Sequence, residues 1–138
     1  MDSQHRRFYF RRIRSTTPDP RHVLGRAGER LALEHLQRLG YLLVARNHRT
    51  RYGEIDLIVL IGSTLVFVEV KTRRSRDAAS PWDSLNHHKR KQVRRLAGAF
   101  LAENPQRPSP RSLRFDAIGI LLDGRGMLVR LDHIEDAF

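Results

Sequence analysis

Two neighbouring apolar stretches of the sequence each carry two charged residues at alternate positions. The first stretch contains Glu54 and Asp56, and the second contains Glu69 and Lys71. Carboxylates that lie close together repel one another unless a cation offsets their charge, and Mg²⁺ and Mn²⁺ bind preferentially to carboxylate and water oxygens. The pattern therefore predicts a site for Mg²⁺ or Mn²⁺, with Asp56 and Glu69 as ligands and Glu54 in support.

Such a site would suit the hydrolysis of a phosphodiester bond. A bound metal polarises a phosphodiester oxygen and lowers the pKa of a bound water. Lys71 would position that water or stabilise the charge that develops at phosphorus. The same residues also fit a second interpretation, in which Lys71 forms salt bridges with Glu54 and Asp56 at a strand end and neither metal nor catalysis is involved.

An antiparallel hairpin would bring these four residues together. The segment Gly62-Ser63 is typical of a two-residue turn between strands, here over residues 54–60 and 65–71. The two-residue period of a strand then puts the charged residues on one face. The predicted facing pairs are Asp56 with Glu69 and Glu54 with Lys71. The predicted apolar residues of the other face are Ile55, Leu57, Val59, Val66, Val68 and Val70.

The elements around this hairpin predict an α/β domain. A first helix ends at Gly40, and Glu29 lies at the edge of its apolar face, where it can point toward a sheet. The other predicted elements are a strand over 41–45, a helix that starts near Asp83 or Ser84, and strands over 113–122 and 127–131. The order αβββαββ implies a mixed central sheet flanked by helices.

Length and composition indicate one domain, over residues 23–138, after a flexible basic arm over residues 1–22. The chain has 138 residues and no cysteine, which excludes disulfides and thiolate-bound zinc. It contains neither an apolar run long enough for a membrane helix nor the apolar core of a signal peptide. We therefore expect a cytoplasmic protein that does not associate with membranes.

The charge balance favours nucleic acid as the partner. Lysines and arginines number 26 against 15 aspartates and glutamates, for a net charge of +11, and such a chain is attracted to polyanions. A soluble, arginine-rich protein with merely solvated basic faces is the alternative. The predicted nucleic-acid contacts are Arg49, Arg51, Arg73, Arg74, Lys89, Arg90, Lys91 and Arg94.

Beyond this reading of individual residues, the sequence resembles a known family. Asp56 followed by Glu69-Val-Lys71 is similar to the PD-(D/E)xK nuclease superfamily, which includes restriction enzymes and Holliday-junction resolvases. Further motifs, in their order, resemble the YraN family, also called uncharacterised protein family 0102. These motifs are Gly25-Arg-Ala-Gly-Glu29, Asn47-His-Arg-Thr-Arg-Tyr-Gly-Glu-Ile-Asp-Leu-Ile58, Val66-Phe-Val-Glu-Val-Lys-Thr-Arg73, Lys89, Arg114-Phe-Asp116 and His133-Ile-Glu-Asp-Ala-Phe138.

The resemblance implies a restriction-endonuclease-like fold and a role for each matching residue. Asp56 and Glu69 would bind the metal, Lys71 would be the catalytic lysine, and Glu29 would be an acid that reaches the site from a helix. The implied activity is endonucleolytic cleavage of DNA, including branched or repair intermediates, or of RNA, with DNA favoured. Two alternatives stay open: a homodimer, as in resolvases, and a catalytically silent module that binds nucleic acid or the ribosome.

Overall fold

The computed structural model describes residues 19–74, 87–106 and 109–138. Most of the predicted basic arm and the predicted start of the second helix lie outside these residues. The described elements are α2 (Pro20–Arg38), β1 (Leu42–Thr50), β2 (Gly53–Ile61), β3 (Thr64–Arg74), α3 (His87–Glu103), β4 (Ser112–Leu122) and β5 (Leu128–Ile134). Their order, αβββαββ, is the predicted one.

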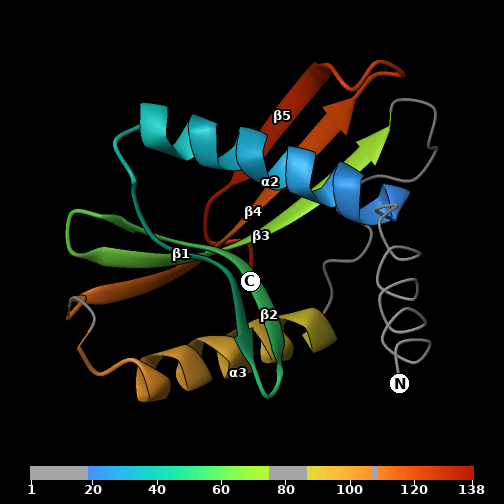
Figure 1. Cartoon of the computed structure of the whole chain (residues 1–138). Coiled ribbons are helices and arrows are strands. Elements are labelled where there is room, and N and C mark those ends of the chain that lie inside the picture. The colour runs from blue at the N-terminus through green and yellow to red at the C-terminus, as the bar shows by residue number, and fades with distance from the viewer. Residues whose placement is uncertain (1–18, 75–86, 107–108) are drawn as a thin grey trace, which may run out of the picture.

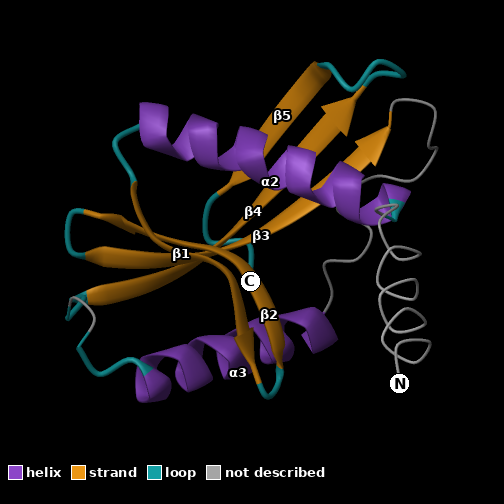
Figure 2. Cartoon of the chain, in the orientation of Figure 1, coloured by secondary structure: helices purple, strands orange, loops and turns teal. Residues whose placement is uncertain are grey.

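The five strands form one mixed sheet in the order β1-β2-β3-β4-β5. β3 and β4 are parallel, and the other neighbours are antiparallel. Parallel neighbours need a long crossover connection, and α3 lies within the one that joins β3 to β4. The two helices lie on opposite sides of the sheet (Figure 2). This α/β arrangement is consistent with the predicted restriction-endonuclease-like fold.

Each helix buries a separate apolar core against the sheet. On the α2 side, Leu36 packs with strand residues such as Val66 and Ile118. On the α3 side, Phe100 packs with a second group that includes Phe67. The strands are thus buried on both faces at their centre, which explains why their sequences are continuous apolar runs. A charged residue within such a run stands out, and the candidate site lies among these charged residues.

The ends of α2 are fixed by local hydrogen bonds. The Asp19 side chain caps the first turn by accepting a hydrogen bond from the Arg21 N–H at 2.9 Å, so the helix begins within the segment predicted as an arm. At the other end Gly40 takes a φ of +94°, and the Tyr41 N–H donates to the Leu36 carbonyl at 3.0 Å. The predicted stop at Gly40 is confirmed. Neither described helix is long and apolar enough to cross a membrane.

The predicted β2–β3 hairpin is confirmed at its turn and in its register. Ile61 pairs with Thr64 across the turn, and Gly62 takes a φ of +57°. The pairing continues only as far as Leu57 with Val68. Beyond that point β2 bends away with β1 toward α3, whereas β3 continues beside β4 (Figure 1).

This separation corrects three predictions about the hairpin. Asp56 does not pair with Glu69, because the pairing of β2 with β3 ends at Leu57. Glu54 does not face Lys71 for the same reason, and its partner in the pairing of β1 with β2 is Arg49. Ile55 does not share a face with Leu57, because Ile55 packs in the core on the α3 side and Leu57 in the core on the α2 side. The strict alternation of a straight strand fails where β2 bends, next to Asp56.

The strand predicted over 41–45 is longer than expected. β1 extends to Thr50, and its second half is polar because β1 is an edge strand whose side chains are largely exposed. A polar edge strand lacks the apolar alternation on which the prediction depended. Because its backbone nevertheless pairs with β2, Asn47 lies beside the bend of β2.

Candidate metal centre

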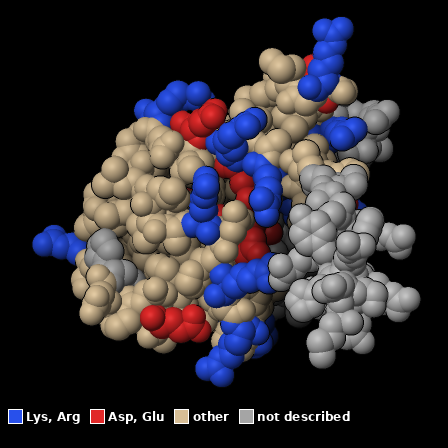
Figure 3. Space-filling view, in the orientation of Figure 1, with Lys and Arg blue, Asp and Glu red and all other residues tan. Residues whose placement is uncertain are grey.

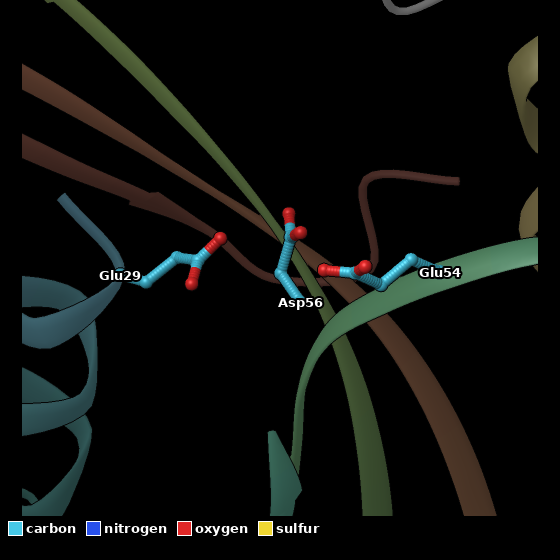
Figure 4. A group of neighbouring side chains, drawn as sticks. All are labelled: Glu29, Glu54 and Asp56. Carbon is cyan, nitrogen blue, oxygen red and sulfur yellow. The ribbon is translucent and has the colours of Figure 1, made fainter. Parts of the chain in front are cut away.

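Three carboxylates converge at the bend of β2. Glu29 comes from α2, and Glu54 and Asp56 come from β2; their oxygens lie within 4.8 Å of one another. Figure 4 shows Glu29 and Glu54 extending toward Asp56 from opposite sides. The prediction that Glu29 points toward the sheet is thereby confirmed. Glu54, predicted only in support, belongs to the cluster itself.

Asp56 occupies the point where β2 leaves β3. Its Oδ2 accepts a hydrogen bond from the Val70 N–H at 2.8 Å. In the register of the hairpin Asp56 would pair with Glu69, but the pairing ends one position earlier, at Leu57. The carboxylate thus replaces the missing strand as the partner of the Val70 N–H, which holds Asp56 in place.

The cluster carries more negative charge than its surroundings offset. Burial, the neighbouring charge of Glu69 and smaller contributions from Glu29 and Glu54 together raise the pKa of Asp56 to about 7. The hydrogen bond from Val70 opposes this shift. Burial also raises the pKa of Glu29, against the effect of a hydrogen bond from Asn47. A cation among these oxygens would reverse both shifts.

Asn47 connects the helix and strand carboxylates. With its amide nitrogen turned toward them, it donates to Glu29 Oε2 at 2.8 Å and to Glu54 Oε1 at 3.1 Å. Its backbone has a φ of +50°, a conformation that asparagine adopts more readily than most residues. Asn47 was not among the predicted site residues, although an asparagine inside a strand was a usable signal.

Gly28 allows α2 to approach the sheet closely. A Cβ at this position would lie 1.8 Å from Thr72 Oγ1 and 2.8 Å from Thr72 Cβ, so a larger residue would push α2 away from β3. The next residue is Glu29, whose carboxylate therefore reaches Asp56. Sequence reasoning missed Gly28 because the contact joins segments far apart in the chain.

Glu69 and Lys71 lie on β3, in register with Ala117 and Gly119 of β4. Both are partly buried, and their two-residue spacing places them on the same side of the strand. Glu69 is outside the group of three converging carboxylates, yet its charge is the strongest of the neighbouring charges that act on Asp56. The structure therefore places Glu69 beside the cluster, with Lys71 one pleat further along β3.

Basic side chains border the acidic cluster. Arg49 Nε lies 3.4 Å from Glu54 Oε2, and the charges of Arg26 and Arg46 lower the pKa of Glu29 against the larger effect of burial. On the face seen in Figure 3, acidic side chains are flanked by Lys and Arg side chains. This arrangement is suited to a polyanion whose backbone approaches the carboxylates.

The other predicted nucleic-acid contacts differ in their surroundings. Arg90 and Lys91 are exposed on α3. Arg94 instead donates a hydrogen bond to the Phe138 carbonyl at 3.2 Å and lies over the Phe115 ring, so it fastens the C-terminus to α3. Arg51 lies in the β1–β2 turn, and Arg73 and Arg74 are partly buried near the end of β3. The side chain of Lys89 lies outside the described residues.

A second charged group, centred on Asp116, is fully paired. Asp116 is buried and accepts two hydrogen bonds from Arg114 at 2.8 Å, one from the Asp136 N–H at 3.0 Å, and shares one with His133 at 2.8 Å. Burial alone would raise the pKa of Asp116, but the hydrogen bonds from His133, Arg114 and Asp136 lower it below its ordinary value. These contacts tie β4 to β5 and to the C-terminal segment, so the network supports the fold.

The sheet and its two described helices form an α/β protein with a restriction-endonuclease-like fold. A family model described as "Uncharacterised protein family UPF0102" matches residues 28–120. A UPF0102 protein of Pelotomaculum thermopropionicum is 40% identical over 120 residues, which cover 87% of this chain and 98% of that protein. One of Chlorobium chlorochromatii is 44% identical over 119 residues, which cover 83% and 90% respectively. The chain belongs to family UPF0102, and the predicted family is confirmed.

Proposed function

We propose that this protein is a metal-dependent nuclease that hydrolyses phosphodiester bonds. The observation that carries the proposal is the convergence of Glu29, Glu54 and Asp56 within 4.8 Å. These carboxylates come from a helix and a strand, and Glu69 lies close enough to act on the same centre. The net charge of +11 supports nucleic acid as the substrate.

The residues present fit a hard divalent cation. All the donors are carboxylate oxygens, which Mg²⁺ and Mn²⁺ prefer. Burial is the main cause of the raised pKa values of Asp56 and Glu29, and a bound cation would favour their ionised forms. Asp56 would hold the ion together with Glu29 and Glu54. Glu69, the second ligand expected from the sequence, would complete the set.

When bound, the metal would polarise the scissile phosphate and lower the pKa of the attacking water. Other residues of the chain would orient the metal ligands. The Val70 N–H holds Asp56, and Asn47 holds Glu29 and Glu54 in one orientation. Lys71 would stabilise the charge that develops at phosphorus. Arg46 and Arg49, exposed on β1, would bind flanking phosphates.

A cleavage assay with Mn²⁺ tests the proposal. Labelled duplex, single-stranded and branched DNA, and RNA of matched sequence, are incubated with the wild type, Asp56→Asn, Lys71→Ala and the control Glu103→Gln, which alters an exposed carboxylate at the end of α3. We expect cleavage by the wild type and by the control only. Cleavage that persists in both Asp56→Asn and Lys71→Ala would come from a contaminant and would refute the enzymatic assignment.

The high positive charge also fits a second function, a catalytically silent module that binds nucleic acid or the ribosome. Such a module would bind with a strong salt dependence and gain no stability from Mn²⁺. A nuclease with the proposed site would gain stability from Mn²⁺, and Asp56→Asn would lose that gain. Thermal unfolding with and without Mn²⁺ therefore separates the two functions.

A further inference from the structure

The turn between β1 and β2 presents an aromatic ring close to two guanidinium groups. Tyr52 is 41% exposed. The guanidinium carbon of Arg51 lies 5.3 Å from the centre of its ring, and that of Arg95, from α3, lies 5.5 Å from the same centre. Both distances are within the range of a cation–π contact. Tyr52, Arg51 and Arg95 are called the stacking platform below.

The platform is held in place by the turn itself. Thr50 Oγ1 accepts a hydrogen bond from the Tyr52 N–H and donates one to the Gly53 carbonyl, both at 3.1 Å. Gly53 takes a φ of +132°, which side-chain-bearing residues rarely adopt, and it lies against Leu96 of α3. The turn is therefore docked on α3, and the backbone that carries the Tyr52 ring is held in place.

The charges of the platform have no anionic partner in the part of the chain that the structure describes. Among residues 19–74, 87–106 and 109–138, Arg51 and Arg95 form no salt bridge, whereas Arg49, two residues earlier, pairs with Glu54. Two guanidinium groups beside one ring repel each other. A ligand with a planar face and a negative charge would relieve this repulsion and would stack on the ring or on a guanidinium plane.

We infer that the stacking platform binds an unpaired nucleotide of the substrate, with the base stacked and its phosphate between the two arginines. In the interior of a duplex both faces of each base are covered by its neighbours, so the inferred substrate class is nucleic acid with a single-stranded or unpaired segment. The inference rests on the proposed function. Tyr52 precedes Asp56 by four residues, so at roughly 3.3 Å per residue their Cα atoms lie at most about 13 Å apart, which keeps the platform near the metal centre.

Binding to single-stranded and duplex DNA tests the inference. Full-length protein in EDTA is titrated against a labelled single strand and against the matching duplex, and Kd is measured by fluorescence anisotropy for the wild type, Tyr52→Ala and Tyr52→Phe. Loss of one stacked base is expected to weaken single-strand binding by roughly 5- to 150-fold in Tyr52→Ala. Tyr52→Phe keeps the ring and should bind like the wild type, and duplex affinity should not change in either variant.

A 2-aminopurine in the single strand gives a second readout, because its fluorescence is quenched when it stacks. Quenching should occur with the wild type and with Tyr52→Phe and be lost with Tyr52→Ala. Arg95→Gln should weaken single-strand binding more than Arg90→Gln, which removes the same charge from an exposed position of α3. Equal single-strand affinity of Tyr52→Ala and the wild type, or equal losses on both substrates, would overturn the inference.

The failure of the inference can be told apart from the failure of the proposed nuclease function. Stabilisation by Mn²⁺ depends on Asp56 and needs no nucleic acid, so it is measured on Tyr52→Ala in parallel. A variant that keeps the Mn²⁺ effect and wild-type single-strand binding would refute the platform and leave the metal centre standing. If Mn²⁺ does not stabilise the wild type, the metal centre is refuted, whatever the platform binds.

Discussion

Replacing Asp56 by asparagine should stabilise the metal-free protein, and increasingly so as the pH rises. The pKa of Asp56 is about 7 in the folded protein against an ordinary value of 3.8. Between these values the unfolded chain has lost the proton and the folded protein retains it, so the stability of the wild type falls as pH rises through this window. Asparagine mimics the protonated acid and can still accept the hydrogen bond from Val70.

The magnitude follows from the difference of about three pH units. Each unit corresponds to about 1.4 kcal/mol, so the advantage of Asp56→Asn should grow from near zero at about pH 4 to at most about 4 kcal/mol above pH 7. For a chain of this length that advantage is a rise of at most roughly 15 °C in Tm. Urea and thermal unfolding in EDTA between acidic and mildly alkaline pH measure it, with Glu103→Gln as the control for the loss of one carboxylate.

Manganese should offset much of this difference between the two proteins. An ion that binds only the folded state adds about 2.7 kcal/mol at a concentration a hundred times its Kd, and the wild type should receive this gain chiefly above pH 7, where Asp56 is deprotonated. Asp56→Asn should gain little. A wild type whose stability in EDTA does not change with pH, or an Asp56→Asn variant that is less stable than the wild type at pH 8, would refute the charge argument.

Three further substitutions test how the site and the fold are held. Gly28→Ala should lower the free energy of unfolding by about 1–3 kcal/mol and weaken Mn²⁺ binding, because the added Cβ pushes α2 away from β3. Gly98→Ala is the control, since a Cβ there meets nothing within 4 Å, and it should raise the Tm in a thermal melt. Asn47→Ala should weaken Mn²⁺ binding by roughly 10- to 100-fold in calorimetry; unchanged affinity would contradict its role. Asp116→Ala should lower the free energy of unfolding by about 3–5 kcal/mol in urea. Asp132→Ala, which removes an exposed ion pair, should lower it by at most about 1 kcal/mol. Similar losses in the two variants would show that the buried network stabilises the fold no more than an exposed ion pair.

The hairpin register and the orientation of Glu29 could be predicted because they depend on local periodicity. A two-residue turn fixes the pairing of the strands that flank it, and the edge of an apolar helical face fixes the direction of a side chain. Pairing arithmetic assumes that the strands stay together, however. It therefore could not show that β2 leaves β3 at Asp56, or that Glu54 thereby comes to face Arg49 and joins the cluster.

Other features depend on contacts between distant segments and leave little trace in the sequence. The space that Gly28 needs is set by Thr72 of β3, and the partners of Arg94 are Phe115 and the C-terminal carbonyl. A basic helix predicted as a nucleic-acid contact thus includes one arginine that is occupied within the protein. A count of basic residues cannot distinguish an arginine that is bonded within the protein from one that is free to bind a ligand.

The complete pairing of Asp116 has a practical consequence. Because the ion pairs that hold β4, β5 and the C-terminus are separate from the acidic cluster, inactivating substitutions in the cluster need not weaken the scaffold. If the proposed function is correct, Asp56→Asn should therefore be a stable, inactive protein that still binds its substrate. Crosslinked to nucleic acid in living cells and sequenced, such a variant would report which molecules the native protein meets.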